Sequence, residues 1–250
     1  MARIVLLHAV PVTGALWDQV AADLRRRGHH VVAPDLRGFG SVPTGGAPPS
    51  IATMAADALP LLGDGAIVAG CSMGGYAALQ ILRSHPELVH GLALIDTKAT
   101  ADGDAARERR EAVARMAEGG GAWSEGMLDA LVGTTTREQR PDVVSAVEAA
   151  LGAAPRPGVA WAQRAMAARP DSRAALAAFG GPVTVVWGEE DTVLSPHAEQ
   201  ELMLEARRVA IGPDQPAPST TFVTVAGCGH LSPLECPGPV ADAIAALAAR

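Results

Sequence analysis

The sequence has little of several features, and each shortage excludes a class of protein. One lysine, Lys98, stands among 20 lysines and arginines, the net charge is −7, and no basic cluster offsets it. Such a chain does not present the positive surface that nucleic-acid binding requires. No apolar run is long enough for a membrane span, and the start, MARIVLLHAV, lacks the features of a signal peptide. We therefore expect a cytoplasmic protein with neither a nucleic-acid nor a membrane partner.

Cysteines and aromatic residues are also scarce. Cys71, Cys228 and Cys236 are odd in number and lack the spacing of metal ligands. This favours reduced thiols over a disulfide framework, and it predicts no metal site. Aromatic residues make up 3% of the chain, so the few tryptophans become informative about where the chain packs.

What the sequence does contain is a globular composition, 48% hydrophobic and 19% charged over 250 residues. Short runs that are apolar at every position are separated by amphipathic stretches, which is typical of parallel strands covered by helices on both faces. We expect an α/β fold with a mostly parallel sheet of about six strands. The strands are predicted at 3–7, 30–34, 66–70, 92–95, 182–187 and 221–225, and the helices between them at 16–27, 51–62, 73–84, 197–208 and 238–249.

The alternation stops between 97 and 180. This stretch has helical patterns and no convincing strand, and it is too long for a loop. We expect a helical cap over residues 97–180, inserted before the penultimate strand, and a core domain made of 1–96 and 181–250. The cap helices are predicted at 104–118, 124–132, 137–152 and 158–168.

The segment GCSMGGY at 70–76 follows the third predicted strand and begins the next helix. A G-x-S-x-G pattern in this context is typical of a nucleophile elbow, a sharp turn in which a Cβ at either glycine would meet the backbone. The pattern also arises by chance, in roughly one chain in ten of this composition. The strand and helix around it favour Ser72 as a nucleophile.

A serine nucleophile requires a base and an acid that orients it. His230 lies in AGCGHLSP after the last strand, at the sheet edge that also carries Ser72. The acid is either Asp191, in WGEEDTVLSP, or Asp96, which follows LALI. The order Ser, Asp, His favours Asp191. His8 and Asp35 are expected to brace loops by hydrogen bonding.

These segments together resemble the α/β-hydrolases nearly from end to end. The motifs are HAVPVTGALWDQ, PDLRGFG, GCSMGGYAAL, VVWGEEDTVLSP and GCGHLSPLECP. The amino-acid sequence of the cap is similar to that of small bacterial carboxylesterases and 3-oxoadipate enol-lactonase-like hydrolases. The resemblance implies Ser72 as nucleophile, His230 as base and Asp191 as orienting acid, without metal or cofactor. It also implies an oxyanion hole from the backbone N–H groups of Met73 and Val10.

Two departures from the family pattern stand out. The first two family strands are missing, which predicts six strands in place of eight. Ala9 occupies the position after His8 where glycine is usual, and its side chain can narrow the oxyanion hole or shift its backbone.

The resulting expectation is hydrolysis of a small-molecule ester or lactone by a monomer or homodimer. A thioesterase, peptidase, perhydrolase or lyase on the same triad, or a receptor-like member without catalysis, stays open. We expect short acyl chains, because the cap looks apolar and shows no obvious charged anchor. The predicted substrate-binding residues, which packing between cap helices would also explain, are Trp123, Leu128, Trp161, Leu194 and Leu231.

Overall fold

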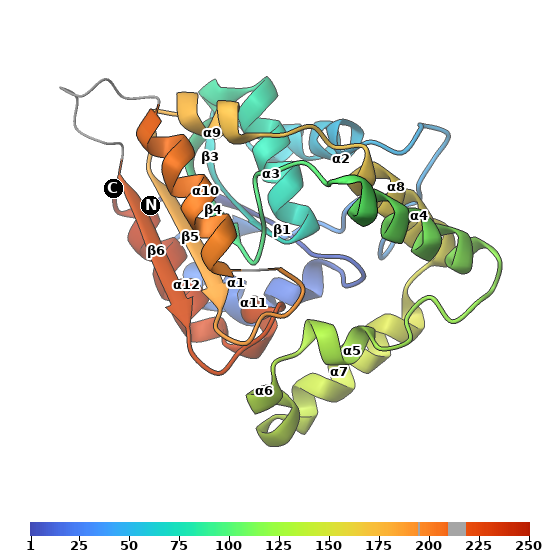
Figure 1. Ribbon diagram of the computed structural model, residues 1–250. Helices are drawn as coiled ribbons and strands as arrows, with labels where there is room; N and C mark the ends of the chain where they lie inside the picture. The colour runs from blue at the N-terminus through green and yellow to red at the C-terminus, as the bar shows by residue number, and fades with distance from the viewer. Residues whose placement is uncertain (195, 210–218) are drawn as a thin grey trace.

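The computed structural model describes residues 1–194, 196–209 and 219–250, and in these residues six strands form one parallel sheet (Figure 1). The spatial order is β2-β1-β3-β4-β5-β6, and the sheet is open. The prediction of a six-stranded parallel α/β fold is confirmed. The strands are β1 (Arg3–Leu7), β2 (His30–Val32), β3 (Ala66–Cys71), β4 (Val89–Ile95), β5 (Val183–Gly188) and β6 (Thr220–Val225).

Helices alternate with these strands in the order that the amphipathic stretches predict. They are α1 (Asp18–Arg26), α2 (Ile51–Ala58), α3 (Met73–Ser84), α10 (Pro196–Val209) and α12 (Pro237–Ala248), with the short α11 (Ser232–Glu235) before α12. Strand β4 begins three residues earlier than expected, since Val89 pairs with Ala66 of β3 although the exposed His90 interrupts the apolar run.

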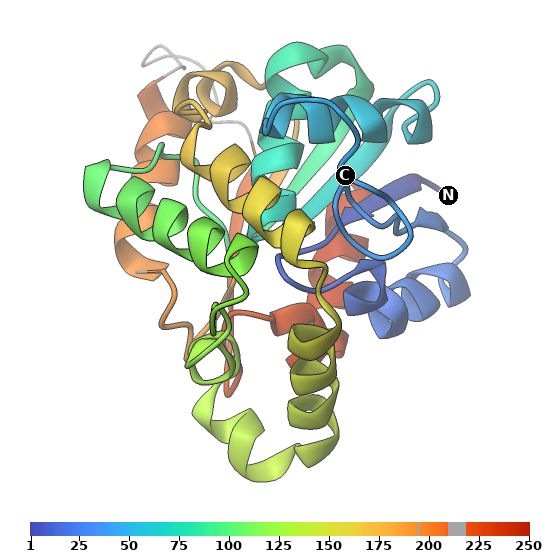
Figure 2. The same ribbon diagram turned by 90° about the vertical axis from the view of Figure 1, so that its right-hand side faces the viewer.

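Two hydrophobic cores form, one on each face of the sheet. Alternate residues of a strand face opposite sides, so Leu7 and Val68 join the core under α2 and α3, whereas Leu6 and Ala69 join the core under α1 and α12. Both faces are therefore covered (Figure 2), which explains why the central strands β1, β3, β4 and β5 are almost entirely buried and largely apolar. Within the described residues, no helix has the length and apolar character needed to cross a membrane.

Residues 97–180, which we call the cap segment, connect β4 to β5 through helices. These are α4 (Asp104–Glu118), α5 (Met127–Leu131), α6 (Thr134–Gln139), α7 (Pro141–Ala153), α8 (Arg156–Ala167) and α9 (Arg173–Ala178). The helix predicted at 137–152 is two helices, because Pro141 starts α7 and cannot continue α6. Figures 1 and 2 show α4 and α8 side by side, with α5 to α7 forming a separate group.

Candidate active site

Ser72 occupies the turn between β3 and α3 with a backbone conformation that few L-residues adopt. Its φ is +51° and its ψ −113°. The turn is tight on both sides, because a Cβ on Gly70 would collide with the Gly74 carbonyl, and one on Gly74 would collide with the Leu7 carbonyl. Such strain persists only where the surroundings hold it, and it is often found at active sites. The glycines on either side of Ser72 are therefore sterically required.

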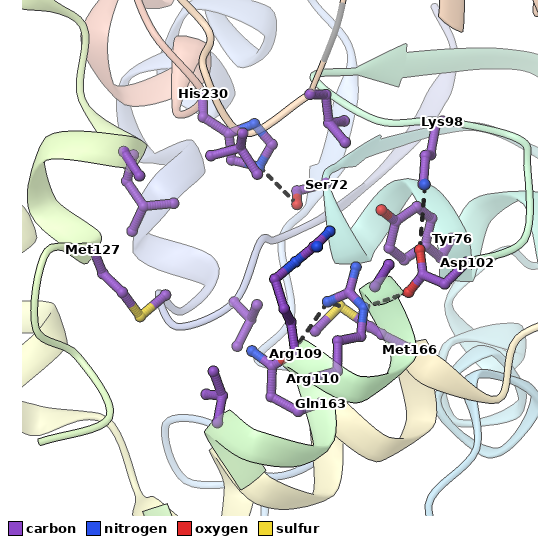
Figure 3. Close-up of a pocket in the computed structure, with 17 residues that line it drawn as sticks. Ser72, Tyr76, Lys98, Asp102, Arg109, Arg110, Met127, Gln163, Met166 and His230 are labelled. Carbon is purple, nitrogen blue, oxygen red and sulfur yellow. Dashed lines mark hydrogen bonds and ion pairs between the residues drawn. The ribbon is translucent and has the colours of Figure 1, made fainter. Parts of the chain in front are cut away.

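The structure brings Ser72, Asp191 and His230 together from the carboxyl ends of three strands. His230 Nε2 lies 2.8 Å from Ser72 Oγ, and His230 Nδ1 lies 2.8 Å from Asp191 Oδ2 (Figure 3 shows the serine contact). A carboxylate can only accept, so the Nδ1–H donates to Asp191 and Nε2 is left to accept the serine hydroxyl proton. This is the tautomer that general-base catalysis needs.

The surroundings of His230 raise its pKa above the ordinary 6.5. Burial alone lowers the pKa of this imidazole, but the charge and hydrogen bond of Asp191 outweigh it, with further support from the charges of Asp96 and Glu235. The imidazolium that forms during catalysis is thus stabilised mainly by Asp191.

The two strand-end aspartates have different partners. Asp191 Oδ1 accepts the backbone N–H groups of Val193 (2.8 Å) and Leu194 (3.3 Å), which leaves Oδ2 for the histidine. Asp96 does not hydrogen-bond to His230. It accepts the Gly188 N–H at 2.8 Å and the Ser232 hydroxyl at 2.6 Å, and burial raises its pKa to about 8.

Two further carboxylates tie the catalytic loops to the cap segment. Glu235 Oε2 accepts the N–H groups of Gly133 and Gly229, both at 2.9 Å. Glu190 accepts the Thr135 N–H at 2.8 Å and its hydroxyl at 2.5 Å. The Glu190 carboxylate thus satisfies a backbone donor and a hydroxyl donor at the start of α6.

The two oxyanion-hole candidates come from different segments of the chain. Met73 is the first residue of α3, where the amide has no partner within the helix, and Val10 lines the cavity beside Ser72. The loop that carries Val10 is fixed by His8, whose Nδ1–H donates to the Ala9 carbonyl while Nε2 accepts the Leu36 N–H, each at 2.8 Å. Burial lowers the pKa of His8 to about 4, so its ring is neutral.

Asp35 accepts the Gly14 N–H at 2.9 Å. The bracing roles predicted for His8 and Asp35 are therefore confirmed.

Cys71 is fully buried behind the serine, and burial raises the pKa of its thiol well above the ordinary value. It does not supply a thiolate nucleophile. In the described ranges, no group of three or more His, Cys, Asp or Glu side chains is arranged to hold a metal ion.

A cavity of about 300 Å³ opens beside Ser72 and His230, and its lining differs from the expected apolar one (Figure 3). Of the five predicted substrate-binding residues, only Leu194 lines it. The other four residues pack in or against the hydrophobic cores. Trp123 and Trp161 lie in the core under α2 and α3, Leu231 is fully buried in the opposite core, and Leu128 packs against that core.

Charged side chains form part of the cavity wall instead. Lys98, Arg109 and Arg110 line it together with Asp102. The expectation that no charged anchor is present is therefore wrong. These residues lie in DTKATADGDAARERRE, whose charges suggest an ordinary solvated helix face. The signal that could have found them is the adjacent Arg109–Arg110 pair at the start of a cap that must cover the strand ends.

Comparison with known proteins agrees with this architecture. The model of the alpha/beta hydrolase family matches residues 4–243. Lipase LipV of Mycobacterium tuberculosis is 31% identical over 144 residues, which cover 50% of this chain and 52% of the lipase. The chain thus matches about half the length of that curated relative.

Solved structures match over the whole chain. A thermophilic esterase from Thermogutta terrifontis, in a malate-bound form, is 32% identical with a TM-score of 0.88, covering 100% of this chain and 90% of that one. The enol-lactonase from Burkholderia xenovorans LB400 has a TM-score of 0.85 at 21% identity, covering 100% and 92%, and shows the shared fold. The resemblance noted in the sequence is confirmed: the chain belongs to the alpha/beta hydrolase family.

Proposed function

We propose that the protein is a serine hydrolase that cleaves small carboxylic esters or lactones through an acyl-enzyme on Ser72. The observation that carries the proposal is the position of His230, with one ring nitrogen 2.8 Å from Ser72 Oγ and the other 2.8 Å from Asp191. The esterase from Thermogutta terrifontis, 32% identical over the whole chain, supports a carboxylic ester as the bond that is cleaved.

In the proposed acylation, each step has its own group. Ser72 Oγ attacks the carbonyl carbon while His230 Nε2 takes the hydroxyl proton. Asp191 holds the imidazole in place and stabilises its positive charge. The N–H groups of Met73 and Val10 are the donors for the oxyanion that develops on the carbonyl oxygen. The tetrahedral intermediate then collapses, and His230 gives its proton to the leaving alkoxide, which departs as the alcohol.

Deacylation repeats the same steps with water. His230 Nε2 takes a proton from water, the resulting oxygen attacks the acyl carbonyl, and the proton returns to Ser72 Oγ as the acid leaves. With a lactone the alcohol stays attached to the acyl chain, so the product is one hydroxy acid. The cavity of about 300 Å³ is at the lower end of the range for small-molecule sites, which favours a small substrate.

The test is hydrolysis by Ser72→Ala, with Ser84→Ala as the matched control. Ser84 is an exposed serine at the other end of α3, bonded to the Gln80 carbonyl. With p-nitrophenyl acetate and a small lactone, Ser72→Ala should lose roughly four to six orders of magnitude in kcat, whereas the control keeps its activity. A serine-directed organophosphate should add mass to the peptide that contains Ser72. Hydrolysis that survives Ser72→Ala intact would overturn the proposal.

A further inference from the structure

The cavity beside Ser72 contains a guanidinium, that of Arg109, which no group in the described part of the chain neutralises. Arg109 lines the cavity, and its side chain points from α4 into it (Figure 3). Within the ranges that the structure describes, this side chain has no hydrogen-bonding or ion-pair partner. Arginine stays charged at every working pH and presents five N–H donors in a planar fork. A free guanidinium in this place is available to an anion.

The other charged groups at the cavity wall carry more positive than negative charge. Asp102 pairs with Lys98 at 3.2 Å, with Arg110 at 2.5 Å and with Arg169 at 2.8 Å. Burial opposes ionisation of Asp102, but the hydrogen bond from Arg169 and the charges of both arginines hold its pKa below the ordinary value. Arg169 does not line the cavity, so the wall itself has three cations, Lys98, Arg109 and Arg110, and one carboxylate, Asp102. This surplus stands out in a chain whose net charge is −7.

We propose that the natural substrate is an ester or lactone that carries a carboxylate, and that Arg109 binds this carboxylate while the reactive carbonyl lies at Ser72. This inference rests on the proposed hydrolase function. Lys98 and Arg110, held in place by Asp102, contribute a favourable electrostatic field from the same wall. The volume of about 300 Å³ suits half-esters of short dicarboxylic acids and small lactones with a carboxyl substituent.

The expected contribution of Arg109 follows from its surroundings. Hydrogen bonds to charged groups contribute roughly a factor of 10 to 150 in affinity. Arg109 is exposed to solvent, so water and salt weaken its attraction for an anion. We therefore expect the lower end of that range, about tenfold, and a smaller effect at high ionic strength.

The test compares two esters of similar length and different charge. These are the p-nitrophenyl half-ester of glutaric acid, which carries a carboxylate, and p-nitrophenyl pentanoate, which does not. The readout is the ratio of the two kcat/KM values in each variant. Arg109→Gln should lower the ratio about tenfold, mainly through KM of the anionic ester, and Arg109→Lys should lower it less.

The matched control is Arg107→Gln. Arg107 lies on the same helix, is half exposed, pairs with Asp104 at 3.4 Å and does not line the cavity. Its substitution should leave the ratio within about twofold of the wild-type value. An unchanged ratio in Arg109→Gln, or an equal fall in both variants, would overturn the proposal.

Two further measurements identify the anion and separate this proposal from the function it rests on. Glutarate should inhibit hydrolysis competitively and more strongly than inorganic phosphate, and stronger inhibition by phosphate would overturn the carboxylate assignment. Binding of glutarate to Ser72→Ala by calorimetry needs no turnover. If neither ester is hydrolysed, the proposed function fails. Glutarate binding that weakens in Ser72→Ala/Arg109→Gln relative to Ser72→Ala would still support the anion site. If glutarate does not bind to Ser72→Ala, the anion site is overturned.

Discussion

Replacing Asp191 by asparagine tests the proposed triad at its most specific point. The new Oδ1 can keep the hydrogen bonds from Val193 and Leu194, so the loop has little reason to move. The amide NH₂, however, faces His230 Nδ1, which must then become the acceptor. The ring proton moves to Nε2 and points at Ser72 Oγ, where the base should be. This tautomer exchange costs about 10⁴ in kcat in the serine proteases, or roughly 5.5 kcal/mol of barrier.

Asp96→Asn is the matched comparison, because Asp96 also follows a strand and lies near the same loop. Its side chain hydrogen-bonds to neither Ser72 Oγ nor the His230 ring, so we expect a loss of at most about tenfold in kcat, or roughly 1.4 kcal/mol. Its effect should be on stability. In the wild type the Ser232 N–H donates to Asp96 at 3.2 Å, and in the variant the asparagine NH₂ faces this donor. An unsatisfied buried donor costs about 1–3 kcal/mol of stability.

The stability difference should depend on pH in a defined direction. The pKa of Asp96 is about 8 in the folded protein and 3.8 ordinarily, so the folded state binds more protons between these values. The wild type therefore loses stability as pH rises from about 4 to 8, at up to roughly 1.4 kcal/mol per pH unit. Asparagine has no such dependence, so the disadvantage of Asp96→Asn should shrink or reverse on going from pH 5 to pH 8.

One chromogenic ester and thermal unfolding at both pH values decide the matter. We expect a large kcat defect with near-wild-type Tm for Asp191→Asn, and the opposite pattern at pH 5 for Asp96→Asn. If Asp96→Asn instead shows the larger kcat defect, the orienting role belongs to Asp96 and the triad proposed above is refuted.

Three other predictions concern the base, the elbow and the link to the cap segment. The wild-type kcat/KM should fall as pH drops through the pKa of His230, which lies above the ordinary 6.5; an acid limb at or below pH 6 would contradict this. Gly74→Ala should yield little folded protein or lose at least about 100-fold in kcat, because the added Cβ meets the Leu7 carbonyl; wild-type yield and kcat would show that the turn tolerates a side chain. Glu235→Gln places an NH₂ among buried N–H donors, and it should lower Tm by about 2–10 °C; a Tm equal to that of the wild type would mean that these hydrogen bonds contribute nothing net.

The sequence predicts the fold well because its signals are local. Apolar β-branched runs and amphipathic stretches give the strands and helices nearly at their observed bounds, and the 104–118 helix matches α4 residue by residue. The position of Ser72 follows from steric demands on Gly70 and Gly74, which adjacent residues reveal. Chain order favours the pairing of His230 with Asp191 over Asp96, and the hydrogen bond between His230 and Asp191 agrees with that order.

The cavity could not be predicted because its lining depends on how distant segments pack. The sequence predicts Trp161 in the substrate site, but its indole N–H donates to the Ala47 carbonyl at 3.0 Å and the residue does not line the cavity. Arg109 and Arg110 lie on a helix that is mostly exposed, and nothing in their spacing tells which one pairs with Asp102 and which one stays unpaired in the cavity. Only the crossing of α4 over the strand ends places them beside Ser72.

The hydrogen bonds of Glu190 and Glu235 divide the cap segment into two mechanically different parts. Residues 131–135 are fastened to both loops that carry the acid and the base, and the His230 N–H itself donates to the Leu131 carbonyl at 3.1 Å. Moving α5 and α6 away from the sheet would therefore disturb the triad. Helix α4 carries the cavity's arginines, Arg109 and Arg110, and α8 contributes Gln163 and Met166 to its lining. Among the described residues, neither helix hydrogen-bonds to the loop that carries His230. An exchange of these two helices alone between relatives should thus change which substrates are accepted and leave the catalytic machinery assembled.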